Sequence, residues 1–186
     1  MAQTEFRIEN SEFRMKKYFL LFLILILTLT SYVFAESNYV LPYPSAMPGS
    51  KFYQISLVWG ELKKYWYFGN FGQFKYNLKE SDKYLVEAKT LLEYRQYLLG
   101  HKALKKSDSY FIQTLPYLLN AQSENKNIDQ NRFILRQAAL KHIEALEKLK
   151  LIIPRTFIWQ PEKSLPTTLN LESLIKESVA IRNKYL

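Results

Sequence analysis

Cysteine is absent from this chain of 186 residues, and glycine occurs only five times. Without cysteine the protein has no disulfides, no thiolate zinc ligands, no thiol nucleophile, no covalently attached haem and no lipid-modified cysteine. The scarcity of glycine disfavours an all-β fold, because many tight turns need its positive backbone φ. Hydrophobic residues nevertheless make up 48% of the chain. This content supports a packed core in one domain, or two at most.

Histidine is also scarce, and neither of the two histidines has the surroundings of a catalytic or metal-binding residue. His101 follows a glycine that we expect to end a helix, so it should meet solvent. His142 lies on the apolar stripe of a predicted helix, where a hydrogen-bonded core histidine is more common than a metal ligand. A di-iron site needs Glu-x-x-His on two helices, but Leu98 and Ala139 occupy the glutamate positions.

The familiar sequence signatures of enzymes are missing as well. The chain has no Gly-x-Ser-x-Gly elbow, no phosphate-binding loop and no dinucleotide fingerprint. We therefore expect no catalytic, cofactor-binding or metal-binding residues, and we predict that the protein is not an enzyme. The alternative is an unrecognised enzyme whose acidic side chains converge only in the folded chain.

The longest apolar run follows Met15 and has the layout of a secretory signal peptide. Two lysines come directly after Met15, and a nearly continuous apolar stretch covers residues 18–29. Small residues at the third and first positions before the bond between Ala35 and Glu36 predict cleavage there. The alternative is an uncleaved anchor over residues 18–34, which is short against the ~20 residues that span a bilayer. The complete signal after Met15 also suggests that translation begins at that residue.

The charge balance has to be considered together with this predicted export. The whole chain carries a net charge of +9, and residues 1–35 hold four basic and three acidic side chains, so residues 36–186 carry +8. A basic domain in the cytoplasm would suggest nucleic acid as a partner. A domain that is exported from the cytoplasm does not encounter nucleic acid, so we expect no nucleic-acid partner. We expect a membrane surface or an anionic wall polymer as partner, with an unknown protein partner left open. Alternatively, the lysines only keep a helical protein soluble.

Residues 36–50 form a short arm with three prolines, which hold the backbone close to polyproline geometry. A flexible spacer would be rich in glycine and serine instead. The arm also carries apolar side chains that a spacer would not need. We therefore predict that it docks on the helices through Leu41, Pro42, Tyr43 and Pro44.

Residues 51–153 show helical periodicity and predict the main domain. Apolar residues recur every three or four positions, and polar or glycine-containing stretches separate the segments. The glycine-containing stretch at residues 68–72 reads as a turn, and Gly100 reads as the residue that follows a helix end. The predicted helices cover about residues 52–66, 73–99, 102–121 and 129–152.

Residues 154–186 read as a proline-broken tail followed by a short C-terminal helix. Three prolines interrupt the helical pattern, which predicts an extended segment that Phe157, Ile158 and Trp159 pin to the body. Asn170 is well placed to cap the last helix. The fold class predicted from the whole pattern is all-α, an antiparallel bundle of about four to five helices after the signal segment and the arm.

The first predicted helix has an unusual concentration of aromatic side chains. Phe52, Ile55, Trp59, Leu62 and Trp66 are spaced 3, 4, 3 and 4, which makes one stripe of an amphipathic helix. Aromatic rings beside lysines suit a membrane interface or a sugar polymer. The interpretation that we favour is more ordinary: these rings fill the core between the first two helices. The candidate surface-binding residues are Trp59, Lys63, Lys64, Tyr65, Trp66 and Tyr67.

The order of these segments resembles the bacterial domain of unknown function numbered 5667. The resemblance rests on "LPYPSAMPGSKFYQI", "WYFGNFGQFK", "YNLKESDKYLVEAKTLLE", "ALKKSDSYF" and "LRQAALKHIEALEKL", and it covers about residues 39–149. The chain departs from the family pattern at Ser45, where glycine is common, and in its high lysine content. The resemblance implies an extracytoplasmic helical domain and implies no reaction.

The sequence thus predicts a non-enzymatic, extracytoplasmic helical domain that binds or scaffolds at the outer membrane face or the cell wall. A signal-anchored sensor or assembly subunit is the alternative. Retention of residues 18–34 would distinguish the anchored form from the secreted one.

Overall fold

The computed structural model describes residues 38–186, so the predicted signal segment and the bond between Ala35 and Glu36 lie outside the described residues. Within this range the chain is predominantly helical, and the predicted all-α class is confirmed. Its elements are α2 (Tyr53–Lys63), the 3-10 helix η1 (Lys64–Trp66), α3 (Gly69–Glu93), α4 (Tyr97–Ser123), α5 (Asp129–Lys150), β1 (Thr156–Trp159), β2 (Thr167–Asn170) and α6 (Leu171–Asn183).

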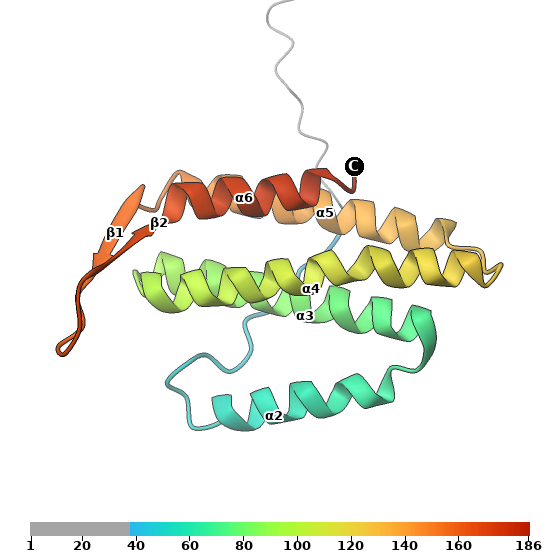
Figure 1. The fold of residues 1–186 in the computed structure, drawn as a ribbon, viewed down its shortest axis with the longest axis horizontal. Helices are drawn as coiled ribbons and strands as arrows, with labels where there is room; N and C mark the ends of the chain where they lie inside the picture. Colours follow the sequence, from blue (N-terminus) through green and yellow to red (C-terminus); the bar gives the residue numbers. More distant parts are fainter. Residues whose placement is uncertain (1–37) are drawn as a thin grey trace, which may run out of the picture. The chain divides into compact units, whose positions relative to one another are not determined.

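Helices α3 to α6 pack side by side as a four-helix bundle, and α2 lies outside it (Figure 1). Helices α3 and α4 form one layer, and α5 and α6 form the other. Helix α2 runs along α3 and α4 on the side opposite α5 and α6 (Figure 1). The arm reaches it through a turn in which the amide of Ser50 donates to the carbonyl of Met47 and Gly49 has a φ of +98°.

The bundle has two apolar clusters, one toward each end of its helices. The first cluster joins Leu85, Ala88, Leu91, Leu92, Ala103, Leu104, Leu146, Leu149, Leu169, Leu171, Leu174 and Ile175. The second joins Phe74, Leu78, Phe111, Leu118, Ala121, Ile128, Leu135, Ala138 and Ala139. In the sequences of α3, α4 and α5, a short stretch between the two sets belongs to neither cluster. These central stretches contain buried polar side chains.

The break between the second and third predicted helices was placed wrongly at Gly100. Helix α3 ends at Glu93, and the chain turns through Arg95, which adopts a φ of +62°. Gly100 lies inside α4, where a Cβ atom would come within 2.5 Å of Cγ of the buried Leu92. This glycine therefore lets α3 and α4 approach closely and does not end a helix.

The predicted turn at residues 68–72 is shorter in the structure. Only its start is non-helical: Phe68 is extended, Gly69 has a φ of +69°, and α3 already begins at Gly69. A single positive φ is enough to reverse the chain between η1 and α3. The remaining residues of the stretch can therefore join the helix.

The proline-broken tail contains a β-hairpin that was not predicted. Strand β1 pairs antiparallel with β2, with Phe157 opposite Leu169. Of the three predicted pins only Phe157 packs against the first cluster, while Ile158 and Trp159 are 63% and 36% exposed. The predicted cap of the last helix is confirmed, because Oδ1 of Asn170 accepts a hydrogen bond from the amide of Ser173 at 2.8 Å.

Candidate functional site

The arm contacts the bundle near its start and near its end, with an exposed stretch at residues 42–45 between the two contacts. Leu41 and Met47 are partly buried against the first cluster, and Tyr39 packs against the second. Tyr43, by contrast, is 96% exposed, and Pro42 and Pro44 also face solvent. Of the four predicted docking residues, Leu41 packs against the bundle, whereas Pro42, Tyr43 and Pro44 do not. Tyr39, which the sequence analysis passed over, docks in their place.

Tyr39 also makes a polar contact with the bundle. Its hydroxyl donates a hydrogen bond of 2.6 Å to Oδ2 of Asp82 in α3. Burial, and then the neighbouring carboxylate, raise the pKa of the Tyr39 phenol, so it stays a protonated donor. The arm is therefore connected to the centre of the bundle.

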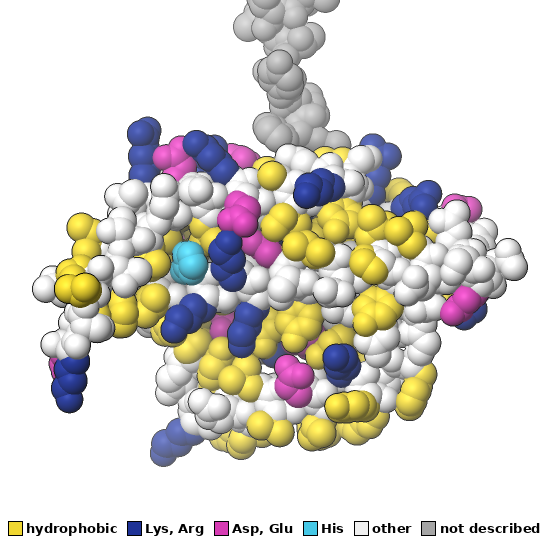
Figure 2. Space-filling view, viewed as in Figure 1, with side chains coloured by type: hydrophobic (Ala, Val, Ile, Leu, Met, Phe, Trp, Pro, Cys, Tyr) yellow, Lys and Arg dark blue, Asp and Glu magenta, His cyan; other side chains and the backbone are white. Residues whose placement is uncertain are grey.

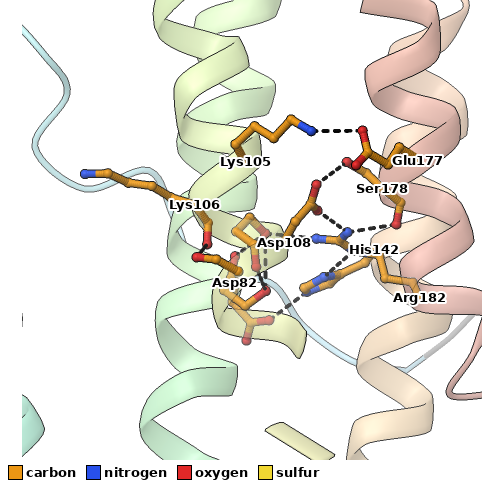
Figure 3. Close-up of polar contacts among 11 residues, drawn as sticks. Asp82, Lys105, Lys106, Asp108, His142, Glu177, Ser178 and Arg182 are labelled. Carbon is orange, nitrogen blue, oxygen red and sulfur yellow. Dashed lines mark hydrogen bonds and ion pairs between the residues drawn. The ribbon is translucent and has the colours of Figure 1, made fainter. Parts of the chain in front are cut away.

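Asp82 belongs to a network of buried polar side chains, which we call the central polar layer. It joins α3, α4, α5 and α6 between the two apolar clusters (Figure 3). Nε2 of His142 lies 2.7 Å from Oδ1 of Asp82, and Nε of Arg182 lies 3.1 Å from Nδ1 of His142. The members of the layer are Ser81, Asp82, Ser107, Asp108, His142, Ser178 and Arg182.

Arg182 is the most connected member of this layer, although its side chain is 0% exposed. Its Nη1 donates to Oδ1 of Asp108 at 2.5 Å and to the carbonyl of Ser178 at 2.9 Å, and its Nη2 donates to Oγ of Ser107 at 2.9 Å. The guanidinium carbon also lies 5.0 Å from the centre of the Phe111 ring, within reach of a cation–π contact. A buried guanidinium needs such partners, because its charge is costly to remove from water.

The contacts of His142 fix its protonation state. A guanidinium has donors only, so Nδ1 of His142 must accept from Arg182 and cannot carry a proton. The proton then sits on Nε2 and points to Asp82, which makes the ring neutral. Burial is the main cause that lowers the pKa of His142, and the charge of Arg182 lowers it further, against the opposing effect of Asp82.

We predict that His142 stays neutral at pH values where an exposed histidine titrates. In a His101→Gln variant His142 is the only histidine, and ¹⁵N NMR should show the Nε2–H tautomer with an apparent pKa below 6.5. Because the unfolded chain binds this proton more readily, stability from His142 is present above about pH 6.5 and is lost as the pH falls toward the folded pKa. A charged ring at pH 7 would contradict the assignment.

The central polar layer is sealed from solvent and therefore offers no access to a substrate. His142 and Arg182 are both 0% exposed, and the two aspartates are 6% and 4% exposed. No group of three or more histidine, aspartate and glutamate side chains in residues 38–186 could hold a metal ion. We interpret the layer as structural, since its complementary groups fix the register of four helices.

A second feature, on the outside of the molecule, is the outward side of α2 and η1, which we call the aromatic face. Hydrophobic side chains gather along the edge formed by α2 (Figure 2). Trp59 and Trp66 are 47% and 62% exposed, and their rings meet edge to face at 5.3 Å. The exposed members are Phe52, Ile55, Val58, Trp59, Leu62, Tyr65, Trp66 and Phe68.

The opposite side of α2, which faces α3, buries little of its surface, and Tyr53, Ser56 and Leu57 are only partly buried. Its only buried residue is Gly60, whose carbonyl oxygen lies 3.3 Å from the hydroxyl of Tyr76. The hydroxyl of Tyr53 donates to Oε1 of Glu87 at 2.8 Å, and burial is the main cause that raises the pKa of Tyr53 to about 12. The predicted core packing of the aromatic stripe is therefore wrong. The stripe exists, but it points outward.

The structure separates the predicted surface-binding residues into two groups. Trp59, Lys64, Tyr65 and Trp66 are exposed, whereas Lys63 and Tyr67 are partly buried. The ring of Tyr67 lies 5.7 Å from that of Tyr76 in α3, so this contact joins the end of η1 to α3.

No helix within residues 38–186 is both long and apolar enough to cross a bilayer. Comparison with protein-family models, with curated proteins and with solved structures finds no match to this chain.

Proposed function

We propose that the protein is a non-enzymatic, extracytoplasmic helical domain that binds an anionic membrane surface through its aromatic face. The observation that carries the proposal is the orientation of α2. Trp59 and Trp66 are 47% and 62% exposed, although the helix has a buried side that faces α3. A helix that served only to cover the bundle would place these rings inward, because burying a large apolar side chain stabilises a fold by about 1.5–3 kcal/mol.

The composition of the aromatic face favours a lipid interface as its occupant. Tryptophan and tyrosine prefer the headgroup level, where an apolar ring and a polar atom are both accommodated. Lys51 and Lys64 are exposed at the two ends of α2, and residues 36–186 carry a net charge of +8. Basic side chains beside an apolar face add electrostatic attraction to anionic lipids of about 1 kcal/mol each.

The proposal predicts salt-sensitive binding to anionic vesicles. Residues 36–186 should co-sediment with vesicles that contain phosphatidylglycerol at low salt, and binding should weaken at high salt because the Debye length shortens. Replacing Trp59 and Trp66 together by serine should weaken binding by about tenfold or more, since 1.4 kcal/mol corresponds to a factor of ten. The matched control is Trp159→Ser, which removes a partly exposed tryptophan from β1.

Three results would count against this role. They are absence of binding at low salt, equal binding to purely zwitterionic vesicles, and equal loss in the Trp159 control. Binding to an anionic wall polymer without binding to vesicles would contradict the lipid proposal. It would show that the aromatic face binds that polymer.

A further inference from the structure

A groove lies where α2 and η1 meet α3 and α4, on the side of α2 that faces away from the aromatic face. Its volume is about 230 Å³, and its lining combines tyrosine rings with amide and charged side chains. Drug-sized ligands occupy pockets of about 300–1,000 Å³, so this smaller groove has room for a ligand about the size of one sugar unit. Its lining includes Asn77, Tyr110, Gln113 and Tyr117.

Asn77 provides a hydrogen-bond acceptor at this groove. Its side chain belongs to a residue that is only 5% exposed, and its Nδ2 donates to the carbonyl of Gln73 at 2.7 Å. This bond fixes the amide so that Oδ1 is left as the free acceptor. Among residues 38–186 the structure gives Oδ1 no hydrogen-bond partner. Gln113 lines the same groove from α4 and is exposed, so its amide is available to donate.

Two tyrosine rings lie beside these amides and are held in place. Tyr110 stacks on Tyr84 with ring centres 5.6 Å apart and an angle of 4°, and it meets Tyr76 edge to face at 6.1 Å. Tyr117 packs partly against the second apolar cluster. Rings fixed in this way lose little entropy when a ligand packs against them.

We propose that this groove binds one N-acetylated hexose unit of a polysaccharide or glycolipid. An acetamido group carries one N–H donor and one carbonyl acceptor, which complement Oδ1 of Asn77 and the amide NH₂ of Gln113. The methyl group and the C–H faces of the sugar ring pack against Tyr110 and Tyr117, as apolar ligand surface does in concave sites. This site is distinct from the aromatic face and does not rest on the membrane role.

The test is saturation-transfer NMR on the full chain in neutral detergent micelles. The probe is N,N′-diacetylchitobiose, and cellobiose is the matched disaccharide without acetamido groups. We expect strong saturation of the acetamido methyl signals and binding of cellobiose at least about tenfold weaker, the effect of roughly one lost polar contact.

Variants locate the binding. Gln113→Ala removes the exposed amide donor, and Asn77→Ala removes the amide acceptor; both should weaken chitobiose binding by about fivefold or more. Gln122→Ala, exposed on the same helix, is the control and should bind as the parent chain does. The Trp59→Ser and Trp66→Ser double variant should keep sugar binding, which separates this site from the membrane proposal. Equal binding of the two sugars, or unchanged binding in both groove variants, would overturn the inference.

Discussion

Replacing Arg182 by alanine should lower the free energy of unfolding by about 3–5 kcal/mol, the usual cost of removing one partner from a buried ion pair. The guanidinium contacts Asp108, His142 and Ser107 within the central polar layer. Its loss leaves the carboxylate of Asp108 buried with only the hydroxyl of Ser178 as partner. It also opens a cavity where a fully buried side chain stood.

Urea denaturation followed by circular dichroism measures this effect. Arg136→Ala is the matched control, because it removes an exposed arginine from α5 and should change stability by no more than about 0.5 kcal/mol. Replacing Arg182 by methionine together with Asp108 by leucine should recover much of the loss, since no unpaired charge remains at that position. A loss below about 1 kcal/mol in Arg182→Ala would show that solvent reaches the layer after all.

Replacing Tyr39 by alanine should cost about 2–4 kcal/mol, the second largest effect that we expect. The ring packs against the second cluster, and its hydroxyl is one of the two donors to Asp82. A hydrogen bond to a charged group contributes about 1.5–3 kcal/mol, and partial burial of the ring adds to it. The sum is large for a residue outside all the helices.

The neighbouring variants divide this effect into its parts. Tyr39→Phe keeps the packing and should lose about 1.5–3 kcal/mol through the hydrogen bond alone. Tyr43→Ala, on the same arm, should be nearly neutral because Tyr43 is 96% exposed. Thermal unfolding of residues 36–186 provides the comparison. If Tyr39→Ala and Tyr43→Ala had the same midpoint, the arm would be a tether without a docking role.

The number and order of the helices could be predicted from periodicity, but their boundaries depended on tertiary contacts. The rule that glycine follows a helix end placed the break at Gly100, yet this glycine is required where α4 passes close to Leu92. The chain instead reverses between α3 and α4 at Arg95, which has a positive φ. An arginine gives no indication in the sequence that it adopts this conformation. The hairpin had a usable signal, because Thr156–Trp159 is rich in the β-branched and aromatic residues that favour strands.

The candidate sites were predicted less well than the helices. Periodicity finds the stripe of α2, but it does not say whether that stripe faces the bundle or the solvent. The central polar layer was detectable in the sequence as polar residues at core positions. The sequence analysis identified only one of them, His142. Ser81 and Ser107 each stand three residues after a leucine and four before the next core residue, so they occupy core positions of their helices. Polar residues at such positions on several helices indicate a shared buried network.

The attachment of α2 has a consequence for the dynamics of the molecule. The helix lies between two residues of positive φ, Gly49 and Gly69, and it contacts α3 through hydroxyl bonds with little buried apolar area. Regions with few buried apolar contacts open with a smaller free energy than the whole domain. We therefore expect α2 to open as a separate cooperative unit, so that its amide protons exchange with solvent faster than those of the four-helix bundle.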